Sequence, residues 1–303
     1  MRDLDPDELL PVGDTVDLRP PHDFRIGHFR SAVNCPLETL DSTLHLLPAR
    51  DAPLWVYGAD TEVGQALALL RGRGYSRVAA HPALSSFASP REGVRATWTA
   101  GEECCRLWRP SAFLAEFWPE VRPSLGADGE ATWSALDLAC GSGRDAVWLA
   151  LAGGRVLGVD HLLDALHMAE DRTLRTARSL AAGAPPPGVD PAAPEWLAAD
   201  LETGVPLRDA RFDLVLVVRF LHRPLLPQLR GLLRPGGTLL YSTFTRQQAK
   251  RGKPTQPAYL FETGELRQAA ERAGMRVRHY RETAPEDGPA LASLWAQAPQ
   301  LSH

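Results

Sequence analysis

The stretch ALDLACGSGRDAVWLALAGGRVLGVD, residues 135–160, decides the fold of this chain. It predicts a buried strand over 134–139, then a glycine turn, a helix, and a second strand that ends at Asp160. Gly141 and Gly143 permit a tight turn in which backbone N–H groups and a helix N-terminus face a ligand. A carboxylate that closes the second strand can accept two hydrogen bonds in a fixed fork, which suits the two hydroxyls of a ribose. The stretch therefore predicts a site for an adenosine-containing cofactor.

Composition and charge limit the class of protein. The chain has 303 residues, a length that favours two domains, and its formal net charge of -4 provides no overall attraction to nucleic acid or to an acidic membrane. The four cysteines show neither a metal-ligand spacing nor a disulfide framework, so we expect no metal; we expect the adjacent Cys104 and Cys105 to be packing residues. A signal peptide and a membrane-spanning apolar run are not recognisable, and we expect a cytoplasmic protein.

The first third of the chain predicts a small α/β layer. Short apolar strands at 15–20, 54–58 and 77–80 alternate with an amphipathic helix over 62–75 that ends at a glycine. Alternating strands and helices form a layer in which helices cover a sheet. We therefore expect a separate α/β domain over residues 1–95.

This domain resembles the rhodanese family in VDLRPPHDFRIGHFRSAVNCPLETL, residues 16–40, which contains an Asp-x-Arg pair, an acid, Gly-His-Phe and AVNCPL. Rhodaneses carry a cysteine directly after the strand that matches LWVY, and an arginine five positions later. This chain has Gly58 and Val63 at those places, so it lacks the thiol nucleophile and the cation that would steady a persulfide. The resemblance implies a catalytically inactive rhodanese-like domain that serves in docking, in homodimer formation or in shielding the second domain.

The cofactor of the glycine turn has two interpretations. GSGRDA matches the G-x-G-x-x-A fingerprint of dinucleotide-binding proteins, so an NAD-dependent oxidoreductase is a rival interpretation. Asp137, however, lies in the strand before the glycines. A carboxylate there would repel a pyrophosphate, but it would attract the ammonium and sulfonium groups of S-adenosylmethionine.

The rest of the chain resembles the class I S-adenosylmethionine-dependent methyltransferases. The resemblance is carried by FDLVLVVRFLH (212–222), LRPGGTLLYSTF (233–244) and a closing strand pair in MRVRHYRE (275–282) and PALASLWAQA (289–298). It implies an α/β, Rossmann-like seven-stranded sheet with an antiparallel last strand, a methyltransferase domain over residues 96–303, and S-adenosylmethionine as the cofactor.

The same resemblance implies roles for residues of the glycine turn and the strand before it. Asp137, Gly141 and Gly143 would line the methionine and ribose end of the cofactor. Ala139 and Cys140 would lie in the same turn.

It also implies the contacts of the nucleoside. Asp160 would bind the ribose hydroxyls and His161 would lie beside the adenine edge. In WLAADLETG, residues 196–204, Asp200 would lie near the adenine amino group and Leu201 would pack on the ring. A loop acid or a helix cap is the alternative interpretation of Asp200.

Candidate catalytic residues follow the fourth strand in RFLHRP, residues 219–224. Ligands of open α/β sheets lie beyond the carboxyl ends of the strands, so Arg219, His222 and Arg223 are expected at the cleft. His222 could accept a proton near neutral pH, and the arginines could hold an anion or lower the pKa of a thiol. Solvated loop charges are the alternative.

Further aromatic residues are candidates for walls of the acceptor site. Trp108 belongs to an aromatic-rich stretch, 105–123, that predicts a helix serving in packing or as a lid. Tyr241, Phe244 and Tyr259 lie in or after the fifth strand.

The expected acceptor is a small-molecule substrate. DLACGSGRDAVWLA, with RFLHRPLL and LLYSTF, resembles methyltransferases of the tellurite-resistance and thiol-methylating type, which implies a soft or anionic nucleophile such as a thiol, sulfide, or a selenium or tellurium compound. Two alternatives stay open. The basic segment 245–254 could recruit RNA, for example tRNA, or the protein could be a non-catalytic scaffold that binds S-adenosylmethionine.

Overall fold

The structure is a computed structural model in which these residues are described: 14–81, 98–101, 106–125, 132–182, 193–207, 212–286 and 288–300. The chain divides into two compact units, here called the first unit (Met1–Arg109 with Leu174–Pro186) and the second unit (Pro110–Thr173 with Pro187–His303). The domain boundary predicted after residue 95, and Cys104 and Cys105, lie outside the described residues. Among the described helices, none combines the length and apolar character needed to cross a membrane.

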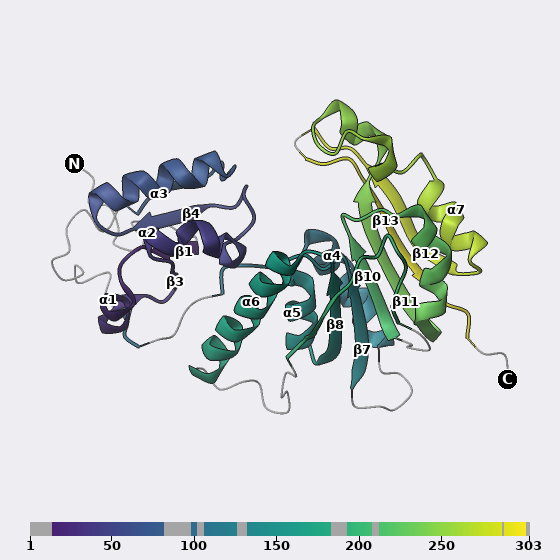
Figure 1. Ribbon diagram of the computed structural model, residues 1–303, viewed down its shortest axis with the longest axis horizontal. Coiled ribbons are helices and arrows are strands. Elements are labelled where there is room, and N and C mark those ends of the chain that lie inside the picture. Colours follow the sequence, from purple (N-terminus) through teal and green to yellow (C-terminus); the bar gives the residue numbers. More distant parts are fainter. Residues whose placement is uncertain are drawn as a thin grey trace, which may run out of the picture. The chain divides into compact units, whose positions relative to one another are not determined.

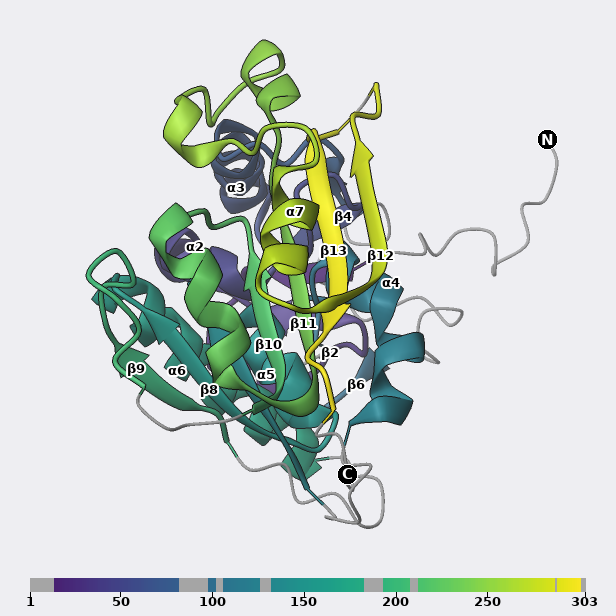
Figure 2. The ribbon, with the colours of Figure 1, turned by 90° about the vertical axis from the view of Figure 1, so that its right-hand side faces the viewer.

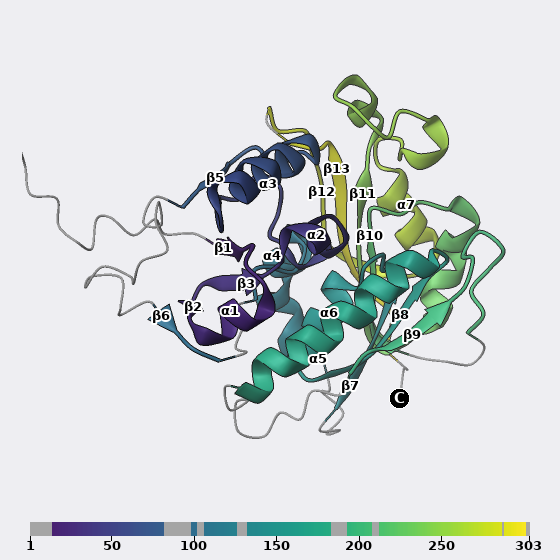
Figure 3. The ribbon, with the colours of Figure 1, turned by 60° about the vertical axis from the view of Figure 1, so that its left-hand side comes forward.

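The first unit contains a four-stranded parallel sheet in the order β3-β1-β4-β5 (Figure 1). Its elements are β1 (Asp14–Asp17), α1 (Pro21–Ile26), β2 (His28–Phe29), β3 (Ala32–Asn34), α2 (Leu37–Leu40), the 3-10 helix η2 (Asp41–Leu46), β4 (Leu54–Tyr57), α3 (Asp60–Gly72), β5 (Val78–Ala80) and β6 (Trp98–Thr99). Helix α3 packs along the sheet (Figure 3), and β2 pairs with β6 in antiparallel fashion. The predicted alternation of strands and helices is confirmed.

A buried charged cluster joins the loops at one end of this small sheet. Asp17 is completely buried and accepts hydrogen bonds from the Arg19 guanidinium, with Nε 3.0 Å from Oδ1, and from the Tyr57 hydroxyl. Arg19 also donates to the carbonyl of Gly27 at 2.6 Å. Burial, with the neighbouring charge of Asp17, raises the pKa of Tyr57, so its hydroxyl stays protonated and acts as a donor. The cluster fixes the ends of β1 and β4 by paired rather than isolated charges.

The second unit is built on a seven-stranded sheet in the order β12-β13-β11-β10-β7-β8-β9. Its strands are β7 (Trp133–Leu138), β8 (Gly154–Asp160), β9 (Glu195–Ala198), β10 (Phe212–Val218), β11 (Leu233–Phe244), β12 (Arg276–Thr283) and β13 (Leu291–Gln297). The pairings from β9 to β11 are parallel, whereas β13 is antiparallel to both β11 and β12. The predicted seven-stranded sheet with an antiparallel last strand is confirmed.

Helices cover both faces of this sheet, which is why its central strands are mostly apolar (Figure 2). One face packs against α4 (Ala112–Val121) and α5 (Arg144–Leu151), and the other against the 3-10 helix η5 (Arg223–Leu232) and α7 (Glu265–Arg272). The remaining elements are η4 (Arg122–Ser124), α6 (Leu163–Ala182), η6 (Arg246–Lys250) and η7 (Pro257–Tyr259).

The aromatic-rich stretch predicted as one helix over 105–123 is shorter in the structure. Helix α4 begins after Pro110, and the Ser111 side chain caps it by accepting from Leu114 N–H at 3.2 Å. Phe113 and Phe117 are buried against the sheet, in agreement with the packing interpretation of the stretch.

Candidate functional site

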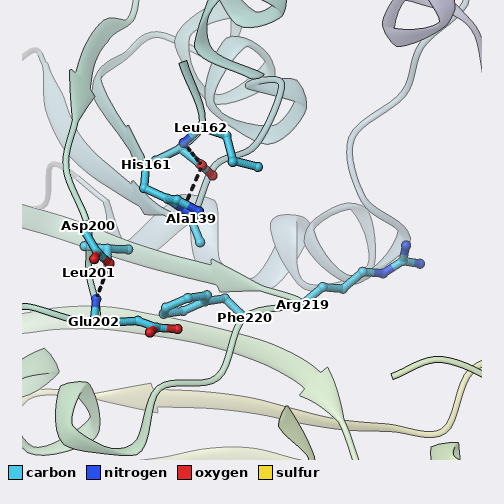
Figure 4. A pocket seen from close by; sticks show the side chains of 9 residues that line it. Ala139, His161, Leu162, Asp200, Leu201, Glu202, Arg219 and Phe220 are labelled. Atoms are coloured by element: carbon cyan, nitrogen blue, oxygen red, sulfur yellow. Dashed lines mark hydrogen bonds and ion pairs between the residues drawn. The ribbon is translucent and has the colours of Figure 1, made fainter. Parts of the chain in front are cut away.

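A cavity of about 320 Å³ lies at the carboxyl ends of β7, β8, β9 and β10 in the second unit. These strands are parallel, so their carboxyl ends meet at the same edge of the sheet, where ligands of open α/β sheets bind. Figure 4 shows the side chains that line it: Ala139, Asp160, His161, Leu162, Asp200, Leu201, Glu202, Arg219 and Phe220. Six of these nine residues were predicted from the sequence as site residues.

The glycine turn after β7 has the backbone geometry that its sequence predicts. Gly141 and Gly143 have φ angles of 53° and 69°, in the left-handed region that L side chains rarely adopt. A Cβ on Gly143 would lie 2.4 Å from the Trp196 ring and 2.6 Å from Cβ of Ala169, so this position also needs glycine for space. A Cβ on Gly141 would meet nothing within 4 Å among the described atoms, so there the φ angle alone selects glycine.

Asp160, at the end of β8, connects the glycine turn to the next helix. Gly141 N–H donates to its Oδ2 at 2.8 Å, and Leu162 N–H donates to its Oδ1 at 2.9 Å. Each carboxylate oxygen therefore accepts one backbone hydrogen bond and retains capacity for a second. This arrangement fixes the carboxylate at the cavity wall with acceptor capacity left for two hydroxyl groups.

Two residues other than glycine adopt left-handed backbone conformations beside the cavity. Ala139 follows β7 with φ 56°, and Arg219 follows the neighbouring strand β10 with φ 59°. Arg219 N–H donates to Ser242 O at 2.7 Å, which holds this conformation against β11. Strained residues of this kind concentrate at functional sites, and both of them line the cavity.

Asp137 is buried in β7 beneath the glycine turn and is not among the residues that line the described cavity, and its role against the cofactor stays a prediction. Its position in β7 turns it to the face covered by α5, where its carboxylate accepts from Ala146 N–H near the start of that helix. Burial, followed by the neighbouring Asp145 and then Asp160, raises the pKa of Asp137 well above its ordinary value. Its direct effect is to hold the helix that carries the turn.

Cys140 is in the turn as predicted, with its Sγ 3.7 Å from Gly141 O. Burial, followed by the charges of Asp137 and Asp160, raises the pKa of this thiol. A thiol in such surroundings remains protonated and is a poor nucleophile. Cys140 therefore belongs to the turn's packing.

The structure brings the residues predicted to contact the nucleoside together. His161 follows Asp160, with Nδ1 3.6 Å from the Asp160 carboxylate, and is exposed. Asp200 accepts from Glu202 N–H at 2.9 Å, while Leu201 is buried at the cavity wall.

The sequence prediction missed three lining residues, namely Leu162, Glu202 and Phe220. Each is one or two positions from a predicted residue. Their place within four residues of the carboxyl ends of β8, β9 and β10 is the signal that could have identified them.

Arg223, a predicted catalytic residue, and Tyr241, a predicted wall of the acceptor site, make contacts within the fold. Arg223 forms a paired contact with Glu265, with Nε–Oε1 2.6 Å and Nη2–Oε2 2.8 Å, and donates to Leu260 O at 2.9 Å. Tyr241 is fully buried and its hydroxyl donates to Phe220 O at 3.0 Å; burial raises its pKa, so it remains a donor. Both residues support the loop after β10 and do not line the described cavity.

The other predicted acceptor-site residues have varied surroundings. His222 is half-buried at the start of η5, and Phe244 lies under Arg219, whose guanidinium carbon is 6.0 Å from the ring centroid. Tyr259 is exposed. Trp108 is buried in the first unit, with the Arg106 guanidinium 5.0 Å from its ring centroid.

The basic segment 245–254 is partly used for internal contacts. Arg246 pairs with Glu262, and Arg251 donates to the carbonyls of Ala284, at 2.8 Å, and Pro285. Lys250 and Lys253 are exposed. Within the described residues, no group of three or more His, Cys, Asp or Glu could hold a metal ion.

The model of the family described as "Methyltransferase domain" matches residues 136–241. This range begins in β7, contains the glycine turn and Asp160, and ends in β11. Residues 136–241 are therefore similar to a methyltransferase domain. The enzyme is a methyltransferase dependent on S-adenosylmethionine, in agreement with the prediction of enzyme class and cofactor.

Other proteins are similar to all or part of this chain. An uncharacterized protein of Schizosaccharomyces pombe is 26% identical over 93% of this chain and 92% of its own length. The ribosomal protein L11 methyltransferase of Pseudomonas aeruginosa is 36% identical over 46% of this chain, but the match spans only 42% of that relative. Among solved structures, a methyltransferase of Methanosarcina mazei aligns with a TM-score of 0.45 at 19% identity, covering 60% of this chain and 98% of its own.

The residues of the cavity fit S-adenosylmethionine. When bound, the cofactor provides an electrophilic methyl group on a positively charged sulfur. The Asp160 carboxylate has two remaining acceptor positions that would suit ribose hydroxyls, and Asp200 and Glu202 would offer further acceptors to a nucleobase. Leu162 and Leu201 would offer apolar surface to its ring. The carboxylates around the cavity also favour a cation over a pyrophosphate.

Proposed function

We propose that this methyltransferase acts on a small soft or anionic nucleophile, such as a thiol, sulfide, or a selenium or tellurium compound. The observation that carries the proposal is a cation, Arg219, in a cavity wall that otherwise contains three carboxylates. A guanidinium favours an anion or a thiolate beside it, and it lowers the pKa of a thiol.

The direction of the Arg219 side chain supports this role. In Figure 4 its guanidinium extends away from Asp200 and Glu202, which lie at the opposite part of the cavity wall. The acids are proposed to serve the adenosine, and Arg219 is proposed to contact the acceptor. The left-handed backbone of Arg219 and its bond to Ser242 O fix where the side chain begins.

An acceptor that arrives protonated needs a base, and we assign this role to His222. It is half-buried and lies two residues after the cavity residue Phe220. Its carbonyl accepts from Leu225 N–H at 3.0 Å, which supports the backbone at this position. An imidazole placed beside the acceptor can serve as a general base.

For the first unit we propose an inactive rhodanese-like domain with a role in docking or dimerisation. Two observations beyond the missing cysteine support inactivity. At the start of α3, the Glu62 carboxylate accepts from Ala59 N–H at 3.3 Å, so an acid of the chain itself lies where an anionic sulfur would need donors. A Cβ on Gly58 would also lie 2.9 Å from Cβ of Leu18.

Macromolecular acceptors are the rivals. The Pseudomonas relatives are named for ribosomal protein L11, and this chain spans about two fifths of their length. RNA would need the basic segment 245–254, in which Arg246 and Arg251 already make internal contacts.

The test is incubation of the protein with methyl-labelled S-adenosylmethionine and separate acceptors. These are a thiol panel, sulfide, selenide, tellurite, bulk tRNA and purified ribosomal proteins. The proposal predicts label in a small-molecule product, and loss of that product in Arg219→Ala with cofactor binding retained. Label only in tRNA or protein would refute it.

A further inference from the structure

Helix α6 contacts the glycine turn through two residues that lie on one side of the helix. Ala169 is completely buried, and a Cβ on Gly143 would lie 2.6 Å from its own Cβ. Arg172 follows three residues later, and positions three apart are neighbours on a helix surface. The turn is therefore held in part by a helix that lies outside its own strand–turn–helix stretch.

Arg172 carries a guanidinium that is almost completely buried, with 2% of the residue exposed. Its Nη1 donates to the carbonyl oxygen of Ser142 and lies 3.2 Å from the Ser142 hydroxyl. Burial, followed by the neighbouring Arg144, lowers the pKa of Arg172 to about 9, while Asp145 and Asp171 oppose this shift. At neutral pH the group stays charged, and charged donors make the stronger hydrogen bonds.

Ser142 is the central residue of the turn, so the orientation of its peptide group sets the orientation of Gly141 and Gly143 on either side. On one side is Gly141, whose N–H donates to the proposed ribose ligand Asp160. On the other is Gly143, which precedes α5. The first residue of α6 follows Leu162, whose N–H donates to the other oxygen of Asp160. Helix α6 thus fixes both the Asp160 carboxylate and the glycine turn that this carboxylate contacts.

We propose that Arg172 is a positioning residue for S-adenosylmethionine: its bond to Ser142 O holds the glycine turn in the orientation that binds the cofactor. This inference depends on the assigned cofactor but not on the nature of the acceptor. The fingerprint GSGRDA, residues 141–146, does not contain this arginine.

The test compares three variants by calorimetric titration with S-adenosylmethionine. Arg172→Met keeps the aliphatic bulk but removes the donor, and we expect about tenfold weaker binding, the equivalent of one hydrogen bond to a charged group. Arg172→Lys keeps a charged donor without the guanidinium fork, and should lose only about threefold. Arg155→Met, at an exposed position of β8, is the matched control and should bind as the unsubstituted chain does.

Hydrogen exchange separates positioning from general support of the fold. In Arg172→Met, amides of residues 140–144 should exchange faster while those of 163–170 in α6 stay protected. If Arg172→Met does not fold, the threefold loss in Arg172→Lys carries the test.

Equal affinity in Arg172→Met and Arg155→Met would overturn the inference, as would exchange that rises equally along α6. Absence of binding to the unsubstituted chain would instead refute the cofactor assignment, and the inference with it.

Discussion

At the scale of single residues, Asp160 carries the largest share of the proposed cofactor site. Asp160→Ala removes two backbone hydrogen bonds and the acceptors for the ribose, so we expect S-adenosylmethionine to bind about a hundredfold more weakly. Asp160→Asn keeps the shape and one acceptor oxygen and should lose about tenfold. Calorimetric titration measures both. Binding of the alanine variant within twofold of the original would contradict the site.

His222 should separate chemistry from binding. We expect His222→Ala to slow turnover of a thiol acceptor by about a hundredfold, as the loss of a general base commonly does, while cofactor affinity stays nearly unchanged. Steady-state rates and titration of the same sample give the two quantities. If affinity falls as much as in Asp160→Ala, His222 belongs to the cofactor site.

Asp137 gives the stability of the cofactor-free protein a pH dependence. Because its folded pKa is raised, the folded state holds a proton that the unfolded state loses above pH 4. Its contribution to stability is present at lower pH and falls as pH rises toward the raised pKa. Asp137→Asn keeps an acceptor for Ala146 N–H and removes the titration, so it should flatten this decline and raise the free energy of unfolding at neutral pH.

Urea unfolding from pH 4.5 to pH 8 measures this difference. The control is Asp164→Asn, at an exposed position of α6, which should leave the slope unchanged. Equal slopes in Asp137→Asn and the unsubstituted chain would show that Asp137 is ionised in the folded protein.

At the scale of elements, hydrophobic pattern and turn chemistry predicted β7, β8 and the glycine turn, and the family resemblance implied β10, β11 and the closing strand pair. β7 and β10 are mostly apolar because both sheet faces are covered, and the left-handed turn needs Gly141 and Gly143. The sequence did not predict which polar side chains would form contacts within the folded chain. Arg223 pairs with Glu265, 42 residues away, and such long-range pairs have no local pattern.

The loop that follows β4 shows the same dependence on tertiary contacts. Gly58→Cys should not create sulfur transfer, because Val63 provides no cation and the new Cβ would press on Leu18, 2.9 Å away. Overpacking of this kind costs about 1–3 kcal/mol. Gly64→Cys is the matched control, since a Cβ there meets nothing within 4 Å of the described atoms. A thiosulfate sulfurtransferase assay tests the prediction; activity in Gly58→Cys would contradict it.

At the scale of the whole molecule, the sequence was sufficient to predict two α/β layers, the seven-stranded sheet with its antiparallel last strand, and the enzyme class. Ala139, Asp160 and Asp200 were predicted to lie against one cofactor, and they line one cavity. Arg172 was not predicted, because a lone arginine in an amphipathic helix resembles any surface charge until the helix is placed beside the turn. The identity of the acceptor stays a proposal, because Arg219 is the one described lining residue from which the acceptor is inferred.

The central claim is that the cavity beside Asp160 binds a cationic nucleoside. Its most direct test is one calorimetric titration series of the unsubstituted chain with S-adenosylmethionine and with NAD. The account predicts saturable one-to-one binding of S-adenosylmethionine, competed by S-adenosylhomocysteine, and no saturable binding of NAD. Saturable binding of NAD with none of S-adenosylmethionine would contradict it.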